Sequence, residues 1–182
     1  MARITPIENS SATPQQRVAL VWIEEHHGAA TNMKRTLARS TASLHALLEW
    51  YPLQAEVKEF LGERGARLFA HAISSGDECV LCTSYFRREL VEAGEDPDNL
   101  LVEGLLAAVA EYGSVLATNP NGVSDELWER LAGSFSGEQL VVLTAFGTLM
   151  IATNVFNNAL SVDLDDGLDA FLAPQSEGAQ RG

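Results

Sequence analysis

Helix start and stop signals recur along this chain between residues 13 and 167, and they constrain its fold more than any other feature. No segment flanked by turn residues alternates apolar and polar side chains with the period of two that a half-buried strand requires. The short β-branched stretches, such as Val141-Val142, lie inside patterns of helical period. The sequence therefore predicts an all-α fold, a single-domain bundle of about seven helices.

The helix boundaries follow from capping residues. Thr13, Ser124 and Ser136 are predicted N-caps, and Ser75 begins a capping-box pattern that Glu78 completes. Gly28 and Gly94 are typical C-terminal stops. The predicted helices span about residues 13–28, 31–50, 53–73, 75–93, 97–117, 124–131 and 137–160.

The last of these helices is apolar on more than one side. Such a helix is usually buried all round, so it is expected to form either the centre of the bundle or an interface between subunits. A homo-oligomer satisfies both interpretations. Its longest apolar stretch, residues 140–152, is broken by Thr144, Gly147 and Thr148. That stretch is shorter than the about 20 residues that cross a bilayer, so no membrane span is expected.

The charge balance restricts the classes of partner. The chain has 12 Lys+Arg against 25 Asp+Glu, a formal net charge of −13. Affinity for nucleic acid depends on Lys and Arg that displace counterions, and anionic lipid surfaces attract the same residues. Neither nucleic acid nor membrane is an expected partner.

The two ends lack apolar periodicity. Residues 1–12 and 173–182 are expected to be flexible segments on either side of a helical domain, residues 13–172. Residues 1–12 also contain no apolar run of signal-peptide length. The expected location is therefore the cytoplasm.

The one short motif that carries chemistry is Cys79-Val80-Leu81-Cys82. On a helix, positions three apart lie on one face, within reach of a disulfide. The positive end of the helix dipole stabilises a thiolate in the first turn, whereas the adjacent Glu78 opposes it. The pattern favours a redox pair, and helix position favours Cys79 as the attacking thiol.

Two other interpretations of the cysteines stay open. They can be small buried side chains without chemistry, because Cys is commonly buried. A zinc site needs two further ligands, and the four histidines include no second ligand pair at zinc-finger spacing: His26, His27, His45 and His71. We therefore expect no metal. A thioredoxin-like site is not expected either, because the flanking sequence shows no βαβ unit.

Three segments, in this order, resemble the carboxymuconolactone decarboxylase-like family and, more narrowly, its alkylhydroperoxidase D-like branch. Residues 33–40 (Met-Lys-Arg-Thr-Leu-Ala-Arg-Ser) are similar to the family's lead-in helix, residues 79–82 to its redox motif, and residues 146–160 to its last core helix. The resemblance covers roughly residues 33–164. It implies an all-α protein that assembles into trimers or hexamers.

The resemblance also implies a thiol-dependent peroxidase or disulfide reductase that needs no cofactor. Its expected partners are a small-molecule peroxide or a thiol or disulfide electron donor. Cys82 is then the thiol that reacts with peroxide, and Cys79 the resolving thiol.

The proton relay of that family is not matched. The family motif places a Glu twelve residues before the first Cys and a His four residues after the second, and these positions hold Arg67 and Phe86. Arg cannot act as a base at neutral pH, and Phe carries no exchangeable proton. The expected supporting residues are instead His71, Glu78, Tyr85 and Arg67 itself.

Two further functions stay open. The wider family implies a non-redox lactone decarboxylase acting on a small ring acid, although a strongly acidic chain suits a dianionic substrate poorly. The missing relay residues leave room for a non-enzymatic helical oligomer whose cysteines are structural or sensing elements.

Overall fold

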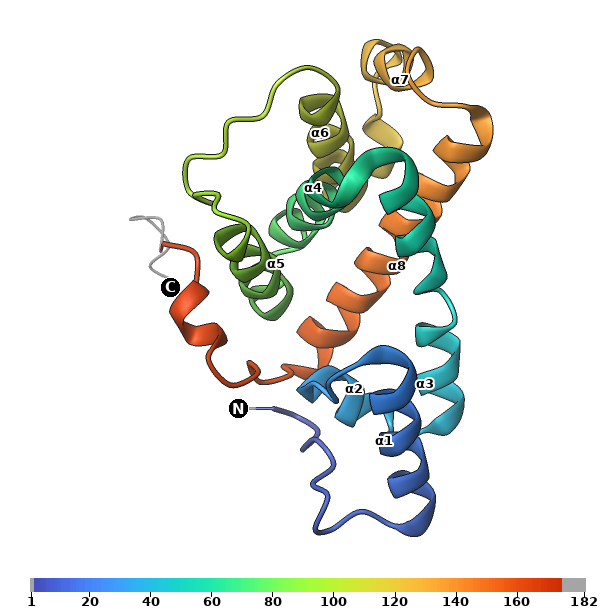
Figure 1. The fold of residues 1–182 in the computed structure, drawn as a ribbon, viewed down its shortest axis with the longest axis vertical. Helices are drawn as coiled ribbons and strands as arrows, with labels where there is room; N and C mark the ends of the chain where they lie inside the picture. The colour runs from blue at the N-terminus through green and yellow to red at the C-terminus, as the bar shows by residue number, and fades with distance from the viewer. Residues whose placement is uncertain (1, 175–182) are drawn as a thin grey trace.

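A computed structural model describes residues 2–174, which form eight α-helices and two short 3-10 helices, with no strand among them (Figure 1). The predicted all-α fold is confirmed. The helices are α1 (Pro14–His27), α2 (Asn32–Leu37), α3 (Thr41–Leu48), α4 (Pro52–Gly76), α5 (Val80–Glu92), α6 (Gly104–Thr118), η1 (Pro120–Gly122), α7 (Asp125–Ala132), α8 (Gly137–Leu160) and η2 (Leu168–Phe171).

Helix α4 is the centre of the bundle and packs against α5, α6 and α8 (Figure 1). The Phe69 ring lies between Tyr112 of α6 and Phe146 of α8, each with its centroid 6.1 Å away. A Cβ atom on Gly113 would lie 2.9 Å from the Phe69 carbonyl oxygen, and one on Gly147 would lie 3.1 Å from the Phe69 ring. The two glycines therefore allow the three helices to approach closely at one level. We call the buried residues around Phe69, which include Tyr112 and Phe146, the central cluster.

A second cluster, the N-terminal cluster, lies under α1, α2 and α3. Its fully buried members include Ile23, Leu44 and Leu48. The segment before α1 packs onto it through Ile7, which is 3% exposed. Arg3 ties the same segment to the end of α8, with its backbone N–H 2.9 Å from the carbonyl oxygen of Leu160. The segment that we expected to be flexible is therefore packed in the structure, whereas most of the expected C-terminal tail lies outside the described residues.

Helix α8 joins the two clusters, because Phe146 belongs to the central cluster and Phe156 packs on the N-terminal cluster. Ser136 and Gln139 form the predicted capping box. Within residues 2–174, α8 is the one helix whose length and composition would allow it to cross a membrane. In the most apolar 18-residue stretch of α8, 44% is buried inside the bundle. A core helix of a soluble protein can have the same length and composition.

Two predicted boundaries are wrong in the first half of the chain. The helix expected over residues 31–50 is two helices, because the Ser40 hydroxyl accepts a hydrogen bond from the Ser43 N–H and starts α3. The helix that carries the cysteine motif is not capped by Ser75, because α4 continues to Gly76 and places Ser75 in its last turn. Cys79 is the N-cap of α5 instead.

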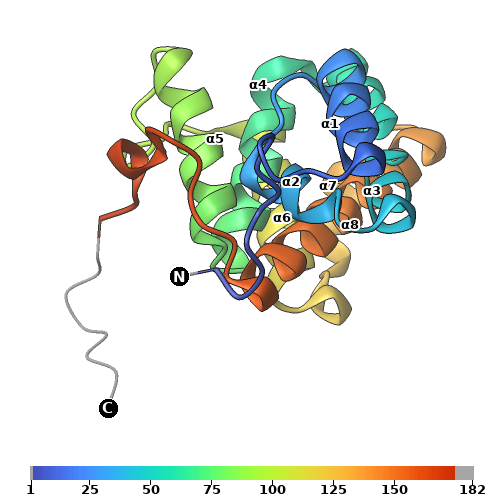
Figure 2. The same ribbon diagram turned by 90° about the horizontal axis from the view of Figure 1, so that it is seen from below.

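The start of α6 also differs from the prediction, which placed it near Pro97. Arg87 of α5 forms two hydrogen bonds with the Asp98 carboxylate, at 2.8 and 3.1 Å, and these hold residues 96–99 in a turn. The Arg87 Nε–H donates to the carbonyl oxygen of Phe171, so η2 packs beside α5 (Figure 2). The helix begins only at Gly104.

Candidate functional site

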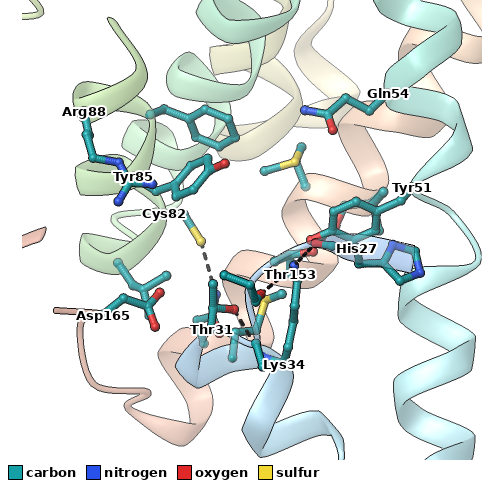
Figure 3. Close-up of a pocket in the computed structure, with 18 of the residues that line it drawn as sticks. His27, Thr31, Lys34, Tyr51, Gln54, Cys82, Tyr85, Arg88, Thr153 and Asp165 are labelled. Atoms are coloured by element: carbon teal, nitrogen blue, oxygen red, sulfur yellow. Dashed lines mark hydrogen bonds between the residues drawn. The ribbon is translucent and has the colours of Figure 1, made fainter. Parts of the chain in front are cut away.

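A cavity of about 830 Å³ lies where α1, α2 and the start of α4 face α5 and α8 (Figure 3). Rings and thioethers form much of its wall, contributed by Met33, Tyr51, Tyr85, Phe86, Phe146 and Met150. Both core clusters contribute to this wall. The cavity is therefore suited to a bulky and largely apolar molecule.

Cys82 opens onto this cavity and Cys79 does not. Cys79 caps α5, and its sulfur accepts a hydrogen bond from the Cys82 backbone N–H at 3.4 Å. Both thiols are free. Cys79 is fully buried, whereas Cys82 is 5% exposed and lines the cavity. A molecule in the cavity would meet the Cys82 sulfur, with the second thiol directly behind it.

The two thiols differ in the pKa that their surroundings impose. Hydrogen bonding with Cys82 lowers the pKa of Cys79, against the effect of its burial. Hydrogen bonding with Cys79, burial and the nearby charge of Cys79 raise the pKa of Cys82. These surroundings favour a thiolate at Cys79 over one at Cys82. Transfer of a proton from Cys82 to a Cys79 thiolate would place the negative charge on the sulfur that faces the cavity.

Three asparagines of α8 hold the cysteine motif in place. The Asn157 amide Nδ2 donates to the Cys82 sulfur at 3.2 Å, the bond drawn from Cys82 in Figure 3. One turn earlier, Asn154 Nδ2 donates to Asp77 Oδ2 at 2.8 Å. The next residue after Asn157, Asn158, donates from Nδ2 to the Asp77 carbonyl oxygen at 2.9 Å. Burial raises the pKa of Asp77, while the hydrogen bond from Asn154 opposes this shift. The loop that leads into α5 is thus fixed by α8.

A buried lysine, Lys34, also lines the cavity. Lys34 Nζ donates to the carbonyl oxygens of His27, at 2.6 Å, and of Ala29, at 3.1 Å, and so closes the C-terminus of α1. Burial lowers the pKa of Lys34, and the charge of Asp165 opposes this effect. Asp165 Oδ1 accepts the backbone N–H of Asn32 at 2.6 Å, so the chain after α8 is tied to the start of α2.

Two tyrosines lie on opposite sides of the cavity (Figure 3). Burial raises the pKa of both Tyr51 and Tyr85. Their hydroxyls therefore stay protonated at neutral pH and can donate hydrogen bonds. The Arg88 guanidinium lies 5.0 Å from the centre of the Tyr85 ring and also lines the cavity.

Of the four supporting residues predicted from sequence, Tyr85 alone lines the cavity. Burial and the charge of Arg87 lower the pKa of His71 to about 4, and its Nε2 has no hydrogen-bond partner among residues 2–174. Glu78 is exposed, with a left-handed backbone (φ 51°), and Arg67 is half-buried away from the cavity lining. The structure does not bring His71, Glu78 or Arg67 to the sulfur that faces the cavity.

Sequence patterns did not identify the polar residues that do line the cavity, above all Asn157, His27, Lys34 and Arg88. For Asn157 a signal existed, because amides within an otherwise apolar helix need buried partners. For His27, Lys34 and Arg88 no local signal existed, because their role depends on how distant helices meet. Among the described residues, no group of three or more His, Cys, Asp and Glu side chains could hold a metal ion.

No protein-family model matches the sequence, and no curated protein matches it significantly. Solved structures do match. The debrominase Bmp8 is 20% identical over 92% of this chain and 95% of its own, with a TM-score of 0.73. A cysteine-to-alanine variant of Bmp8 in complex with 2,3,4-tribromopyrrole is 18% identical over 92% and 94%, with a TM-score of 0.75.

A third solved structure carries the name of the family that the sequence resembles. It is an alkylhydroperoxidase AhpD core, an uncharacterized peroxidase-related protein from Ralstonia eutropha, which is 15% identical over 92% of this chain and 94% of its own. The TM-score is 0.66. At these identities the likeness concerns the fold. The chain therefore has the all-α alkylhydroperoxidase D-like fold that its sequence resemblance predicted.

Proposed function

We propose that this protein is a thiol-dependent oxidoreductase that reduces a bulky, largely apolar organic substrate with Cys82 and Cys79. One observation supports the proposal above all others. The Cys82 sulfur lies in the wall of the 830 Å³ cavity, and a second thiol caps the same helix three residues earlier, behind it. Such a pair can accept an oxidising equivalent from the cavity and resolve it as a disulfide.

With an organic hydroperoxide as substrate, the Cys82 thiolate attacks the outer oxygen. The O–O bond breaks, the alcohol leaves with one proton, and Cys82 becomes a sulfenic acid. Cys79 then attacks the Cys82 sulfur, water leaves, and a disulfide forms. An external dithiol supplies the two electrons that restore both thiols. Tyr51 and Tyr85 are the hydroxyls in the cavity that can donate a hydrogen bond to the departing oxygen.

Peroxide titration of the reduced protein tests this proposal. One equivalent of cumene hydroperoxide should consume both thiols of the wild type and form one disulfide. In Cys79→Ser the reaction should stop at a sulfenic acid on Cys82, and Cys82→Ser should lose turnover. If both wild-type thiols stay unmodified, or if Cys82→Ser retains full turnover, the hydroperoxide step is wrong.

Reductive dehalogenation is the second candidate for the same thiol pair. Two observations favour it: the fold match to a debrominase, and an aromatic-lined cavity at Cys82 to which Phe86 contributes in place of the family's His. The balanced reaction converts an aryl bromide and the dithiol to the debrominated arene, in which hydrogen replaces bromine, the disulfide and HBr. Bromide release from a polybrominated pyrrole, matched by one disulfide per bromide, would identify this reaction. No release would leave the peroxide reaction as the candidate.

We further propose that the protein is a cytoplasmic homo-oligomer, a trimer or a hexamer. The outer face of α8 supports self-association, because apolar or small residues recur on it at alternating spacings of four and three. They are Val141, Ala145, Thr148, Ala152, Val155 and Ala159. This spacing is typical of helices that pack along each other.

The two remaining alternatives have separate tests. Release of carbon dioxide from a muconolactone would identify the lactone decarboxylase-like function. A pKa of about 8.5 or above for both thiols, as for an unactivated Cys, would favour the non-enzymatic oligomer.

A further inference from the structure

The turn that joins α4 to α5 holds a glutamate in a backbone conformation that usually requires glycine. The Glu78 N–H donates to the Ser75 carbonyl oxygen at 3.2 Å, and the Cys79 N–H donates to the Ser74 carbonyl oxygen at 3.0 Å. These two hydrogen bonds form a Schellman motif, with Glu78 at its left-handed position (φ 51°). The Cβ atom of a glutamate makes this conformation unfavourable.

Helix α5 ends in the same motif with the usual residue. There Gly94 occupies the left-handed position (φ 82°), and its N–H donates to the Val91 carbonyl oxygen at 2.9 Å. The Glu95 N–H donates to the Leu90 carbonyl oxygen, also at 2.9 Å. The two ends differ in the strained residue that α4 retains just before the cysteine motif.

Both of the strained turns in the described part of the chain lie at the cysteine pair. Among residues 2–174, Glu78 and Ser161 are the two with a positive φ that are not glycine. Glu78 directly precedes Cys79. Ser161 directly precedes Val162, which packs against the buried cysteine motif. Strain of this kind persists where the surrounding structure enforces it, and it is concentrated at functional sites.

Asn158 of α8 enforces the conformation of Glu78. The peptide plane between Asp77 and Glu78 is held on both sides, because Asn158 Nδ2 donates to the Asp77 carbonyl oxygen at 2.9 Å and the Glu78 N–H donates to Ser75. The hydrogen bond of the Cys79 N–H holds the following plane. Glu78 therefore cannot leave the left-handed region without breaking a hydrogen bond.

This turn decides where the Cys79 sulfur lies. Cys79 is the last residue of the motif that ends α4 and also the N-cap of α5. Its sulfur accepts the Cys82 backbone N–H at 3.4 Å. A hydrogen bond to the charged form and the start of a helix both favour a thiolate. Both effects are lost if the backbone of Cys79 turns away from α5.

We propose that Glu78 and Asn158 are positioning residues, which hold the Cys79 sulfur at the start of α5 through the strained turn and so favour its thiolate. The backbone of Glu78 acts here, and its carboxylate does not. The inference rests on the proposed function, because it concerns the resolving step. In that step the Cys79 thiolate forms an S–S bond with the sulfur of the Cys82 sulfenic acid. The S–O bond breaks, and the hydroxide leaves as water after taking up a proton.

Four proteins separate the backbone of Glu78 from its charge. Glu78→Gln removes the carboxylate and keeps the strain, whereas Glu78→Gly removes both, because glycine adopts a positive φ freely. Each is made with and without Asn158→Ala, which changes an exposed side chain. All four carry Cys82→Ser, which leaves Cys79 as the single thiol and keeps the backbone N–H that its sulfur accepts.

Thiolate absorbance against pH gives the pKa of Cys79, with the Cys79→Ser, Cys82→Ser protein as the baseline. With Glu78→Gln, adding Asn158→Ala should raise this pKa by about one unit, a tenfold loss of thiolate at neutral pH. With Glu78→Gly the same substitution should change the thiolate fraction less than about twofold, because glycine keeps the turn without the amide. An unchanged pKa in the first pair, or equal shifts in both pairs, would overturn the inference.

A second measurement follows the reaction in proteins that keep both cysteines. After one equivalent of cumene hydroperoxide at pH 7, Asn158→Ala in the Glu78→Gln protein should slow disulfide formation about threefold. The tenfold loss of thiolate is partly offset, because a more basic thiolate is a better nucleophile. An unchanged pKa in a protein that does form the disulfide would refute the inference alone. The expected pKa shifts in a protein whose thiols never react would refute the proposed function alone.

Discussion

Cys79 and Cys82 lie three residues apart, yet their environments affect their pKa values in opposite directions. The pKa of Cys79 is lowered chiefly by its hydrogen bond with Cys82, and that of Cys82 is raised chiefly by the same contact. Single substitutions should therefore move the two thiols in opposite directions. Cys82→Ala should raise the pKa of Cys79, and Cys79→Ala should lower the pKa of Cys82.

Thiolate absorbance measured against pH tests this prediction, with the double alanine variant as the baseline for tyrosine. A shift of the remaining thiol in the same direction in both variants would contradict it. The expected outcome would show that the inner thiol is the more acidic of the two, whereas the outer thiol is the one that lines the cavity.

His71 should make the folded protein sensitive to acid. Its folded pKa is about 4, against 6.5 for a free histidine, because burial and Arg87 disfavour the charged form. Between these two values the unfolded chain binds a proton that the folded protein does not bind, so stability falls as the pH falls. The expected contribution is a loss of about 2–3 kcal/mol between pH 7 and pH 4.5.

Urea unfolding of the wild type and of His71→Leu at both pH values measures this loss. The loss of unfolding free energy between pH 7 and pH 4.5 should be smaller in the leucine variant than in the wild type by about 2–3 kcal/mol. It should also be at least as stable as the wild type at pH 7, because it removes a buried nitrogen without a partner. Equal acid losses in the two proteins would show that His71 is not responsible.

At the scale of single residues, the sequence alone identified part of the candidate site. The cysteine motif and Tyr85 share one helix, so their spacing alone predicts a common face, and the structure places Cys82 and Tyr85 on one cavity wall. His71 lies close to the motif in sequence, but α4 carries it toward Arg87 and Asp98 instead. Sequence proximity did not indicate which side of the helix would meet the cavity.

At the scale of helices, the packing of α4, α6 and α8 depends on Gly113. Its missing side chain lets the Phe69 carbonyl oxygen approach to 2.9 Å of the position a Cβ would occupy. Because the nearest atom is backbone, Gly113→Ala must push α6 away from α4. We expect a loss of about 1–3 kcal/mol in the free energy of unfolding, despite the better helix propensity of alanine.

Gly137→Ala is the control for that substitution. A Cβ atom at Gly137, the first residue of α8, would have no neighbour within 4 Å. This variant should change the free energy of unfolding by less than about 1 kcal/mol. Denaturant unfolding of both variants gives the comparison, and equal stabilities would contradict the close approach at Gly113.

Local signals predicted the helices that begin with a strong cap. Thr13, Ser124 and Ser136 start α1, α7 and α8 as expected. The Ser75 to Glu78 pattern failed because α4, which packs on α6 and α8, extends to Gly76 and so includes Ser75 in its last turn. The late start of α6 could not be predicted from the local sequence either, because it depends on a hydrogen bond to Asp98 from Arg87 of another helix. Long-range contacts override local caps at these two positions.

At the scale of the whole molecule, self-association through α8 should be disrupted by charge. Val141, on the outer face of α8, is 69% exposed. Val18 of α1 lies outside that face and is 70% exposed. Val141→Asp should raise the dissociation constant of the oligomer at least about tenfold, because a carboxylate would be buried at the contact. Val18→Asp should leave it unchanged. Sedimentation velocity measures both, and equal molar masses for the two variants would exclude α8 as the contact.

The position of the cavity between the central and N-terminal clusters has a thermodynamic consequence. Met33 belongs to one cluster and Phe146 to the other, and both line the cavity. A compound that fills the cavity completes the packing between two halves of the core, so its binding free energy adds to the stability of the whole chain. At one hundred times its dissociation constant, it should contribute about 2.7 kcal/mol and raise the melting temperature by about 5–10 °C. Thermal denaturation in the presence of a compound library can therefore identify ligands of this protein before its reaction is known.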